Sequence, residues 1–264
     1  MREILEKIQV HIPYYLLREK LLPRVIRERI NPEISFSVLD LERFAAADFR
    51  ETAKRLTDQA LSITFHAPFM DLRPGAVDPA IRRVTLERLR QVCELLPWFR
   101  PRAMVCHPSF DARYYGSPAG PWLENSLETW RALAEELSGT PTVIALENTY
   151  ECDPEPLRLL FSALASPLFR FCFDTGHANA FGSVSTGEWM AALGDRLSEI
   201  HIHDNRGRSD EHLPVGEGSF DFPALLAFVR GQNRRPILTV ECHSEGNLQR
   251  MLENLRAQRL LEGL

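Results

Sequence analysis

The chain has 264 residues, of which 44% are hydrophobic and 25% charged, and its formal net charge is −5. This composition is ordinary for a soluble globular protein, and the length is usual for one (β/α)8 barrel. The acidic balance argues against nucleic acid as the main partner. No apolar run approaches the ~20 residues of a membrane span, so we expect no membrane segment.

Five cysteines occur without C-x-x-C spacing, and three of them fall in strand-like runs. The charged start of the chain does not resemble a signal peptide. Both features predict a cytoplasmic protein with reduced thiols.

Short apolar runs alternate with helix-like periodicity along the chain, which predicts parallel strands joined by crossover helices. Strands are expected at 8–12, 33–39, 61–66, 103–107, 142–147, 168–174, 197–203 and 236–242. Helices are expected at 15–29, 42–58, 78–97, 122–138, 154–165, 186–194, 221–231 and 246–261. An open doubly wound sheet would alternate in the same way. The choice between an open sheet and a closed barrel therefore depends on the polar residues at the strand ends.

Six strand-like runs end in an imidazole or a carboxylate: His66, His107, Glu147, Asp174, His201 and Glu241. An open sheet spreads its strand ends along a line, whereas a closed barrel brings them together on one face. Such side chains suit divalent metal better than an apolar core. We therefore predict an α/β fold in which residues 1–264 form a single (β/α)8 TIM barrel domain.

Glu147, Asp174, His201 and Glu241 form the first candidate metal site, an oxygen-rich set that fits Mn²⁺, Mg²⁺, Co²⁺ or Zn²⁺. His66 and His107, which end adjacent strands, could hold a second metal together with Glu147 or hydrogen-bond substrate oxygens.

A third candidate cluster combines His177 with Asp210 and His212. The D-x-H spacing puts the last two on one side of an extended loop, where they could also form a network that only fixes the loop.

The remaining candidates are assigned to substrate. His203 and His243 point the same way as His201 and Glu241, two residues earlier, so they could orient ligands or meet substrate. His11 and Phe69 complete this group, because an aromatic ring can stack on a substrate. All eight histidines are expected at strand ends or in the loops that follow, and none in a helix.

Seven motifs, in this order, resemble the xylose isomerase-like superfamily of metal-dependent TIM barrels over nearly the whole chain. They are HAPF (66–69), CHPS (106–109), ALEN (145–148), FDTGH (173–177), HIHDN (201–205), DEHLPVGEG (210–218) and VECH (240–243). That superfamily includes sugar and sugar phosphate isomerases and epimerases, and AP endonucleases of the endonuclease IV type.

The isomerase and epimerase branch implies the four-residue metal site, with Glu147 and Glu241 also acting as the catalytic acid/base pair. Our leading hypothesis is a metal-dependent isomerase or epimerase of a sugar, sugar phosphate or related polyol ketone. One carboxylate would abstract a proton and the other return it, through a metal-stabilised enediolate. The partner is then a small carbohydrate; substrate identity and oligomeric state are left open.

The endonuclease IV branch implies three zinc ions held at nine positions, which here are His66, His107, Glu147, Asp174, His177, His201, Asp210, His212 and Glu241. The alternative hypothesis is therefore a trinuclear-zinc phosphoester hydrolase. The chain departs from that branch at Phe69, where a tyrosine is usual, and at 147–156, which lacks a Gly-Gln-Gly-type loop. The cofactor is thus expected to be one to three divalent ions, Zn²⁺ or Mn²⁺. A barrel that keeps metal without catalysis is the third hypothesis.

Overall fold

A computed structural model describes residues 2–233 and 235–264. Eight parallel strands pair in chain order and close into a barrel, because β1 pairs with both β2 and β8. The strands are β1 (Gln9–Pro13), β2 (Asn31–Ser35), β3 (Thr64–His66), β4 (Ala103–Cys106), β5 (Val143–Glu147), β6 (Phe169–Asp174), β7 (Leu197–Ile202) and β8 (Ile237–Val240). The predicted closed α/β barrel is confirmed, and each predicted strand overlaps an observed one.

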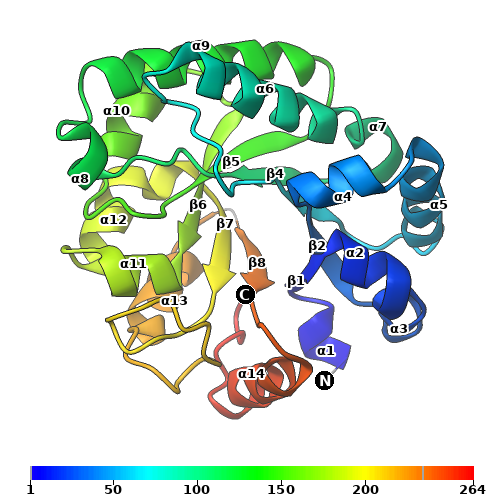
Figure 1. Ribbon diagram of the computed structural model, residues 1–264. Coiled ribbons are helices and arrows are strands. Elements are labelled where there is room, and N and C mark those ends of the chain that lie inside the picture. Colours follow the sequence, from blue (N-terminus) through cyan, green and yellow to red (C-terminus); the bar gives the residue numbers. More distant parts are fainter. Residues whose placement is uncertain (1, 234) are drawn as a thin grey trace.

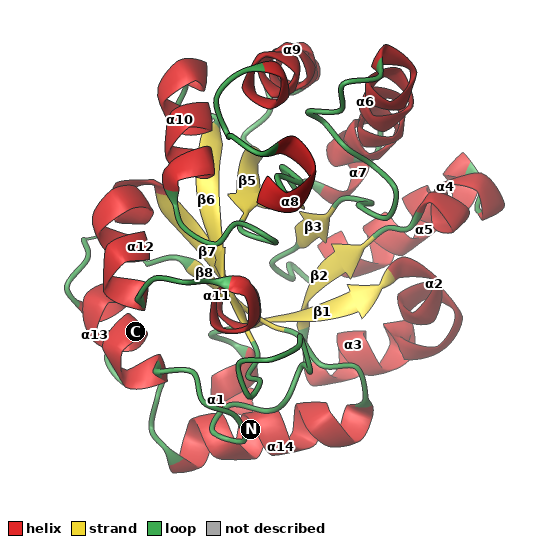
Figure 2. Ribbon diagram, turned by 60° about the vertical axis from the view of Figure 1, so that its left-hand side comes forward, coloured by secondary structure: helices red, strands yellow, loops and turns green. Residues whose placement is uncertain are grey.

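Helices surround the barrel, as Figures 1 and 2 show. They are α1 (Arg2–Leu5), α2 (Tyr14–Leu16), η1 (Leu17–Leu21), α3 (Leu22–Glu28), α4 (Val38–Arg43), α5 (Ala46–Thr57), α6 (Pro79–Cys93), α7 (Leu96–Phe99), α8 (Ala112–Tyr115), α9 (Pro121–Glu136), α10 (Glu155–Leu164), α11 (Thr175–Phe181), α12 (Thr186–Leu193), η2 (Gly194–Arg196), α13 (Phe222–Arg230) and α14 (Glu245–Ala257). None of these helices combines the length and apolar character that a bilayer crossing needs.

Three predicted helices are interrupted. The helix expected at 15–29 contains a π-helical stretch, η1, directly before Pro23 at the start of α3. Proline has no N–H to donate a helical hydrogen bond, so the π-helical turn lies where a regular i to i−4 hydrogen bond would be missing. The helix expected at 42–58 begins only at Ala46 because Phe44 is extended, and the one expected at 78–97 breaks before Leu96–Pro97.

The short helices α1, α8 and α11 were not predicted. The most consequential is α11, which starts immediately after β6 and contains His177. The expectation that no histidine lies in a helix is therefore wrong for this residue. A helix of this length carries too little apolar periodicity to be detected in a sequence.

Both apolar and polar side chains occupy the barrel interior. Side chains alternate along a strand, so every second residue faces inward. Small apolar residues at these positions form one buried cluster: Ala103, Val105, Ala145, Cys172 and Ile237. Continuing the same alternation to the carboxyl ends of the strands brings the predicted polar residues inward as well.

Candidate metal centre

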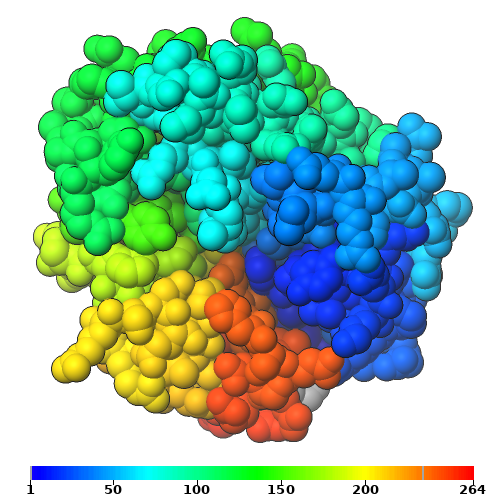
Figure 3. All heavy atoms as spheres, in the orientation of Figure 1, coloured from blue at the N-terminus to red at the C-terminus, as the bar shows by residue number. Residues whose placement is uncertain are grey.

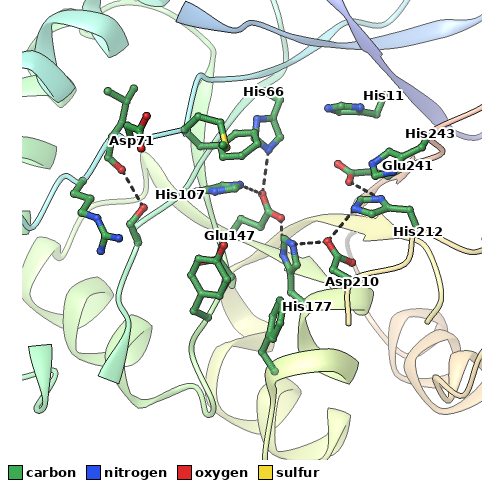
Figure 4. A pocket seen from close by; sticks show the side chains of 18 residues that line it. His11, His66, Asp71, His107, Glu147, His177, Asp210, His212, Glu241 and His243 are labelled. Atoms are coloured by element: carbon green, nitrogen blue, oxygen red, sulfur yellow. Dashed lines mark hydrogen bonds and ion pairs between the residues drawn. The ribbon is translucent and has the colours of Figure 1, made fainter. Parts of the chain in front are cut away.

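A cavity of about 450 Å³ opens at the carboxyl ends of the strands. On the face shown in Figure 3, the surface is hollowed near the centre, where segments far apart in the chain meet. Histidine and carboxylate side chains line one side of the cavity (Figure 4), and Asp71 lies across from Glu241 and His243 on the side formed by residues 69–73.

Glu147, at the end of β5, is the hub of the cluster (Figure 4). Its Oε2 is 3.3 Å from Nε2 of His66 and 3.0 Å from Nε2 of His107. Its Oε1 is 3.1 Å from Nδ1 of His177 and 3.5 Å from Nδ1 of His201. The carboxylate is 1% exposed. Four imidazoles from different strands and loops therefore converge on one buried carboxylate.

His201, on β7, brings the four residues of the first predicted site together. Its Nδ1 lies 3.5 Å from Glu147 Oε1, 3.7 Å from Asp174 Oδ2 and 3.1 Å from Glu241 Oε1. The strand register explains part of this, because Asp174 on β6 is directly opposite His201. One imidazole nitrogen thus lies within 3.7 Å of three carboxylates.

The third predicted cluster also assembles. His177 Nε2 is 3.4 Å from Asp210 Oδ2, which is 2.9 Å from His212 Nε2. Asp174 caps α11 by accepting a 2.6 Å hydrogen bond from the His177 amide, so the strand end places the helix and its histidine.

The loop that carries Asp210 and His212 is held by Asp204. Its carboxylate accepts hydrogen bonds from the amides of Gly216, Gly218 and Phe220, at 3.0, 2.9 and 3.1 Å. Gly216 has φ of +82° and can take this conformation without strain. Gly216 and Gly218 therefore allow the loop to bend around a buried carboxylate.

The four residues assigned to substrate occupy two different places. His11, His243 and Phe69 line the cavity, and the Phe69 ring stacks on His107 with centroids 4.5 Å apart. His203 is fully buried outside the cavity lining, with Nε2 2.9 Å from Asp174 Oδ2 and Nδ1 3.5 Å from Asp210 Oδ1. Of its two predicted roles, the structure favours orienting these carboxylates over meeting substrate.

Three carboxylates of the cluster, Glu147, Asp210 and Glu241, have lowered pKa values despite their burial. Burial alone would raise the pKa of Glu147, but His107 and His201 outweigh it and hold this pKa well below its ordinary value. Burial also opposes ionisation of Glu241, whose pKa is nevertheless lowered by His201 and His11. The pKa of Asp210 is lowered against burial by hydrogen bonds to His177 and His212.

The same contacts raise the pKa values of two imidazoles. Burial opposes protonation of His177 and His201, yet neighbouring carboxylates raise the pKa of both well above its ordinary value. For His11 and His107 burial prevails, and their pKa values are lowered. A divalent cation would supply the positive charge that protons otherwise bring to this cluster.

Several buried nitrogens fit a metal better than they fit hydrogen bonding. His107 Nε2 and His201 Nδ1 lie 3.0 and 3.1 Å from carboxylate oxygens, and His212 Nδ1 lies 3.5 Å from one. None of the three has a hydrogen-bond partner with suitable geometry in the described part of the chain. Buried polar atoms are rarely left without a partner, and atoms that crowd around a common point without alignment are suited to a shared ion.

Sequence reasoning missed several buried polar residues next to the cluster. Glu33 on β2 and Glu199 on β7 are 0% exposed beneath His201. Asn148 bonds both the amide and the carbonyl of Asp174. Glu151 accepts from the Thr149 and Phe110 amides, and burial raises its pKa to about 7. Glu33 and Glu199 occupy inward positions of their strands, so strand alternation would have revealed both.

Residues 31–261 match the sequence pattern of a family described as xylose isomerase-like TIM barrel. The chain belongs to this family. An uncharacterized protein of Methanocaldococcus jannaschii is 28% identical over 188 residues, which are 69% of this chain and 64% of that protein. A probable endonuclease 4 of Symbiobacterium thermophilum is 24% identical over 66% of this chain and 68% of its own length.

Solved structures share the whole fold. A D-tagatose 3-epimerase-like protein covers 97% of both chains with a TM-score of 0.78 and 21% identity, a likeness that shows the fold alone. A Thermus thermophilus protein, TTHB071, whose crystal was soaked with ZnCl2, has a TM-score of 0.70 and 27% identity over 97% of this chain and 98% of its own.

Proposed function

We propose that this family member is a metal-dependent isomerase or epimerase of a sugar, sugar phosphate or related polyol ketone. The observation that carries the proposal is the convergence of Glu147, Asp174 and Glu241 on Nδ1 of His201. Three carboxylates and one imidazole would hold Mn²⁺ or Zn²⁺. The D-tagatose 3-epimerase-like structure, which shares the fold, is compatible with this substrate class.

Glu147 and Glu241 would form the acid/base pair. Glu147 ends β5 and Glu241 follows β8, and both line the cavity (Figure 4). Their nearest oxygens lie 3.5 and 3.1 Å from Nδ1 of His201. Their lowered pKa values keep both ionised, so either oxygen can accept a proton from a carbon next to a carbonyl. A bound divalent ion would supply the positive charge that makes this carbon acidic enough.

The direction of proton return decides the reaction. Return to the opposite face of the same carbon inverts the centre, and return to the neighbouring carbon moves the carbonyl group. Phe69, His11 and His243 line the cavity and would hold the carbohydrate against the two carboxylates.

A second function, phosphoester hydrolysis with three zinc ions, is supported by the assembly of the nine-residue set around Glu147 and Asp210. Within this set, His66 and His107 contact Glu147, and His177 and His212 contact Asp210. The endonuclease 4 relative is compatible with this alternative.

Elemental analysis of protein purified without chelator tests the number of ions. One ion per chain supports isomerase chemistry, and three zinc ions with phosphoesterase activity support the alternative.

Deuterium exchange tests the proposed chemistry directly. Metal-loaded protein is incubated in D₂O with a panel of ketoses and ketose phosphates, and loss of the proton next to the carbonyl is followed by NMR. Glu241→Gln should abolish exchange while circular dichroism shows an intact fold. Glu253→Gln, on α14, is the matched control because its only described contact is to Gln249. Wild-type exchange in Glu241→Gln would refute the assigned role.

A further inference from the structure

Glu33 lies directly beneath His201 and belongs to none of the sets assigned to metal or substrate above. Its Oε1 is 3.3 Å from His201 Nε2, while Nδ1 of the same ring faces the three carboxylates of the candidate metal site. Both side chains are 0% exposed. The two nitrogens of one imidazole therefore have separate partners, one below the ring and one at the cavity.

The carboxylate of Glu33 is held from two sides. Its Oε2 accepts a 3.3 Å hydrogen bond from Thr64 Oγ1, and Thr64 is the residue opposite Glu33 in the β2–β3 register. Glu199 stands on the other side, with Oε1 accepting a 2.7 Å hydrogen bond from Thr239 Oγ1. An oxygen of Glu199 and one of Glu33 both lie within 4.8 Å of a ring nitrogen of His201. The hydrogen bond from Thr64 on the neighbouring strand β3 thus holds Glu33, while Glu199 on β7 is held by Thr239.

Oε1 of Glu33 and Nε2 of His201 are 3.3 Å apart, and neither atom has a hydrogen-bond partner of suitable geometry in residues 2–233 and 235–264. Leaving a buried carboxylate oxygen unpaired is costly, so a donor at this position stabilises the interior. The Cys172 thiol also interacts with the His201 ring, but a thiol is only a weak acceptor. Glu33 is therefore the strongest acceptor available to an N–H at Nε2.

We propose that Glu33 is a positioning residue that accepts the Nε2–H of His201 and so presents the lone pair of Nδ1 to the metal site. A neutral imidazole carries one proton, and a hydrogen bond at one nitrogen selects the other as the metal donor. Without Glu33, His201 can place its proton on either nitrogen and can rotate. The inference rests on the metal centre of the proposed function, but not on its substrate.

Zinc affinity tests this role without measuring turnover. Wild-type protein and variants compete for Zn²⁺ with a chromophoric chelator, and thermal melts of the metal-free proteins report the fold. Glu33→Ala should weaken binding of one ion by ~10–100-fold, the usual effect of removing a partner of a metal-bound histidine. Glu33→Gln retains an acceptor oxygen and should fall between Glu33→Ala and the wild type. Glu199→Gln and Cys172→Ala are matched controls from the same layer and should change affinity much less.

Proton placement gives a second readout. In zinc-loaded wild-type protein, ¹⁵N–¹H NMR should show the His201 proton on Nε2, with a resonance that moves upfield in Glu33→Gln. If Glu33→Ala does not fold, the position of this proton in the zinc-loaded wild-type protein still tests the proposal. A proton on Nδ1 instead of Nε2 overturns it.

Several results would count against the positioning role. Wild-type zinc affinity in a folded Glu33→Ala protein overturns it, as does a diffraction peak for an ion between Glu33 and Glu199. A wild-type protein that binds no zinc overturns both this inference and the metal centre. If zinc binding depends on Glu33 but no ketose exchanges its proton, the proposed function fails and this inference stands.

Discussion

Gly176 is the position where a single methyl group should disturb the metal site most. It lies in α11, and a Cβ added there would be 1.9 Å from Cε1 and 2.3 Å from Nδ1 of His203. Ordinary carbon contacts are about 3.5–4.0 Å, so in Gly176→Ala the ring must move by roughly 1.5–2 Å.

The ring of His203 has little freedom to move. Its Nε2 is 2.9 Å from Asp174 Oδ2, and it stacks on His212 with centroids 3.9 Å apart. Overpacking costs ~1–3 kcal/mol, and losing a hydrogen bond to a charged group costs ~1.5–3 kcal/mol. We therefore expect Gly176→Ala to lower the free energy of unfolding by about 3 kcal/mol, which lowers Tm by ~6–12 °C for a chain of this size. Zinc affinity should fall as well, because Asp174 loses its partner.

Urea denaturation and a zinc titration measure the two effects. Gly246→Ala is the matched control, since a Cβ there meets nothing within 4 Å. It should be neutral or slightly stabilising, because alanine is the better helix former. The double variant Gly176→Ala/His203→Ala should recover part of the packing cost, but not the affinity for zinc. If Gly176→Ala is as stable as Gly246→Ala and binds zinc normally, the close packing of α11 against His203 has been misjudged.

Three further predictions concern pH and the loop at 204–221. Glu151 has an ordinary pKa of 4.5 that burial raises to about 7, so folding takes up a proton between these values. The contribution of Glu151 to the free energy of unfolding should therefore fall by about 3 kcal/mol as pH rises from 4.5 to 7; in urea titrations, Glu151→Gln should remove this part of the pH dependence. Because the pKa values of His177 and His201 are raised, zinc must displace protons, and its affinity should increase with pH above 6.5. Calorimetry in two buffers measures this release, and equal heats would contradict it. Asp204→Ala leaves four backbone amides without this acceptor, those of Asn205, Gly216, Gly218 and Phe220, and should destabilise the loop by ~3 kcal/mol or more; unchanged resistance to limited proteolysis would exclude this anchoring role.

The polar residues at the strand ends were predictable because a parallel barrel imposes a simple rule. His66, Glu147 and Asp174 each end an apolar strand-like run, and closure of the barrel requires such ends to meet. The exact partners were not predictable. That Glu147 contacts four imidazoles depends on the stagger of the strands and on side-chain conformation, which no spacing in the sequence encodes.

His177 and Glu33 show where local patterns fail. His177 belongs to a helix of seven residues that exists because Asp174 caps it at the end of β6, not because of its own periodicity. Strand alternation indicates that Glu33 faces inward, but its contacts with Thr64 and His201 exist only after β2 has paired with β3 and the barrel has closed.

The sequence by itself determined the alternation of strands and helices, and hence the kind of residue available at the rim of the barrel, because these follow from local periodicity and chain order. Only the tertiary structure decided which nitrogen faces which oxygen and which carboxylates lie beneath the rim. Those contacts join residues from different strands and loops, such as Glu33 and His201, and they exist only after the eight strands have closed.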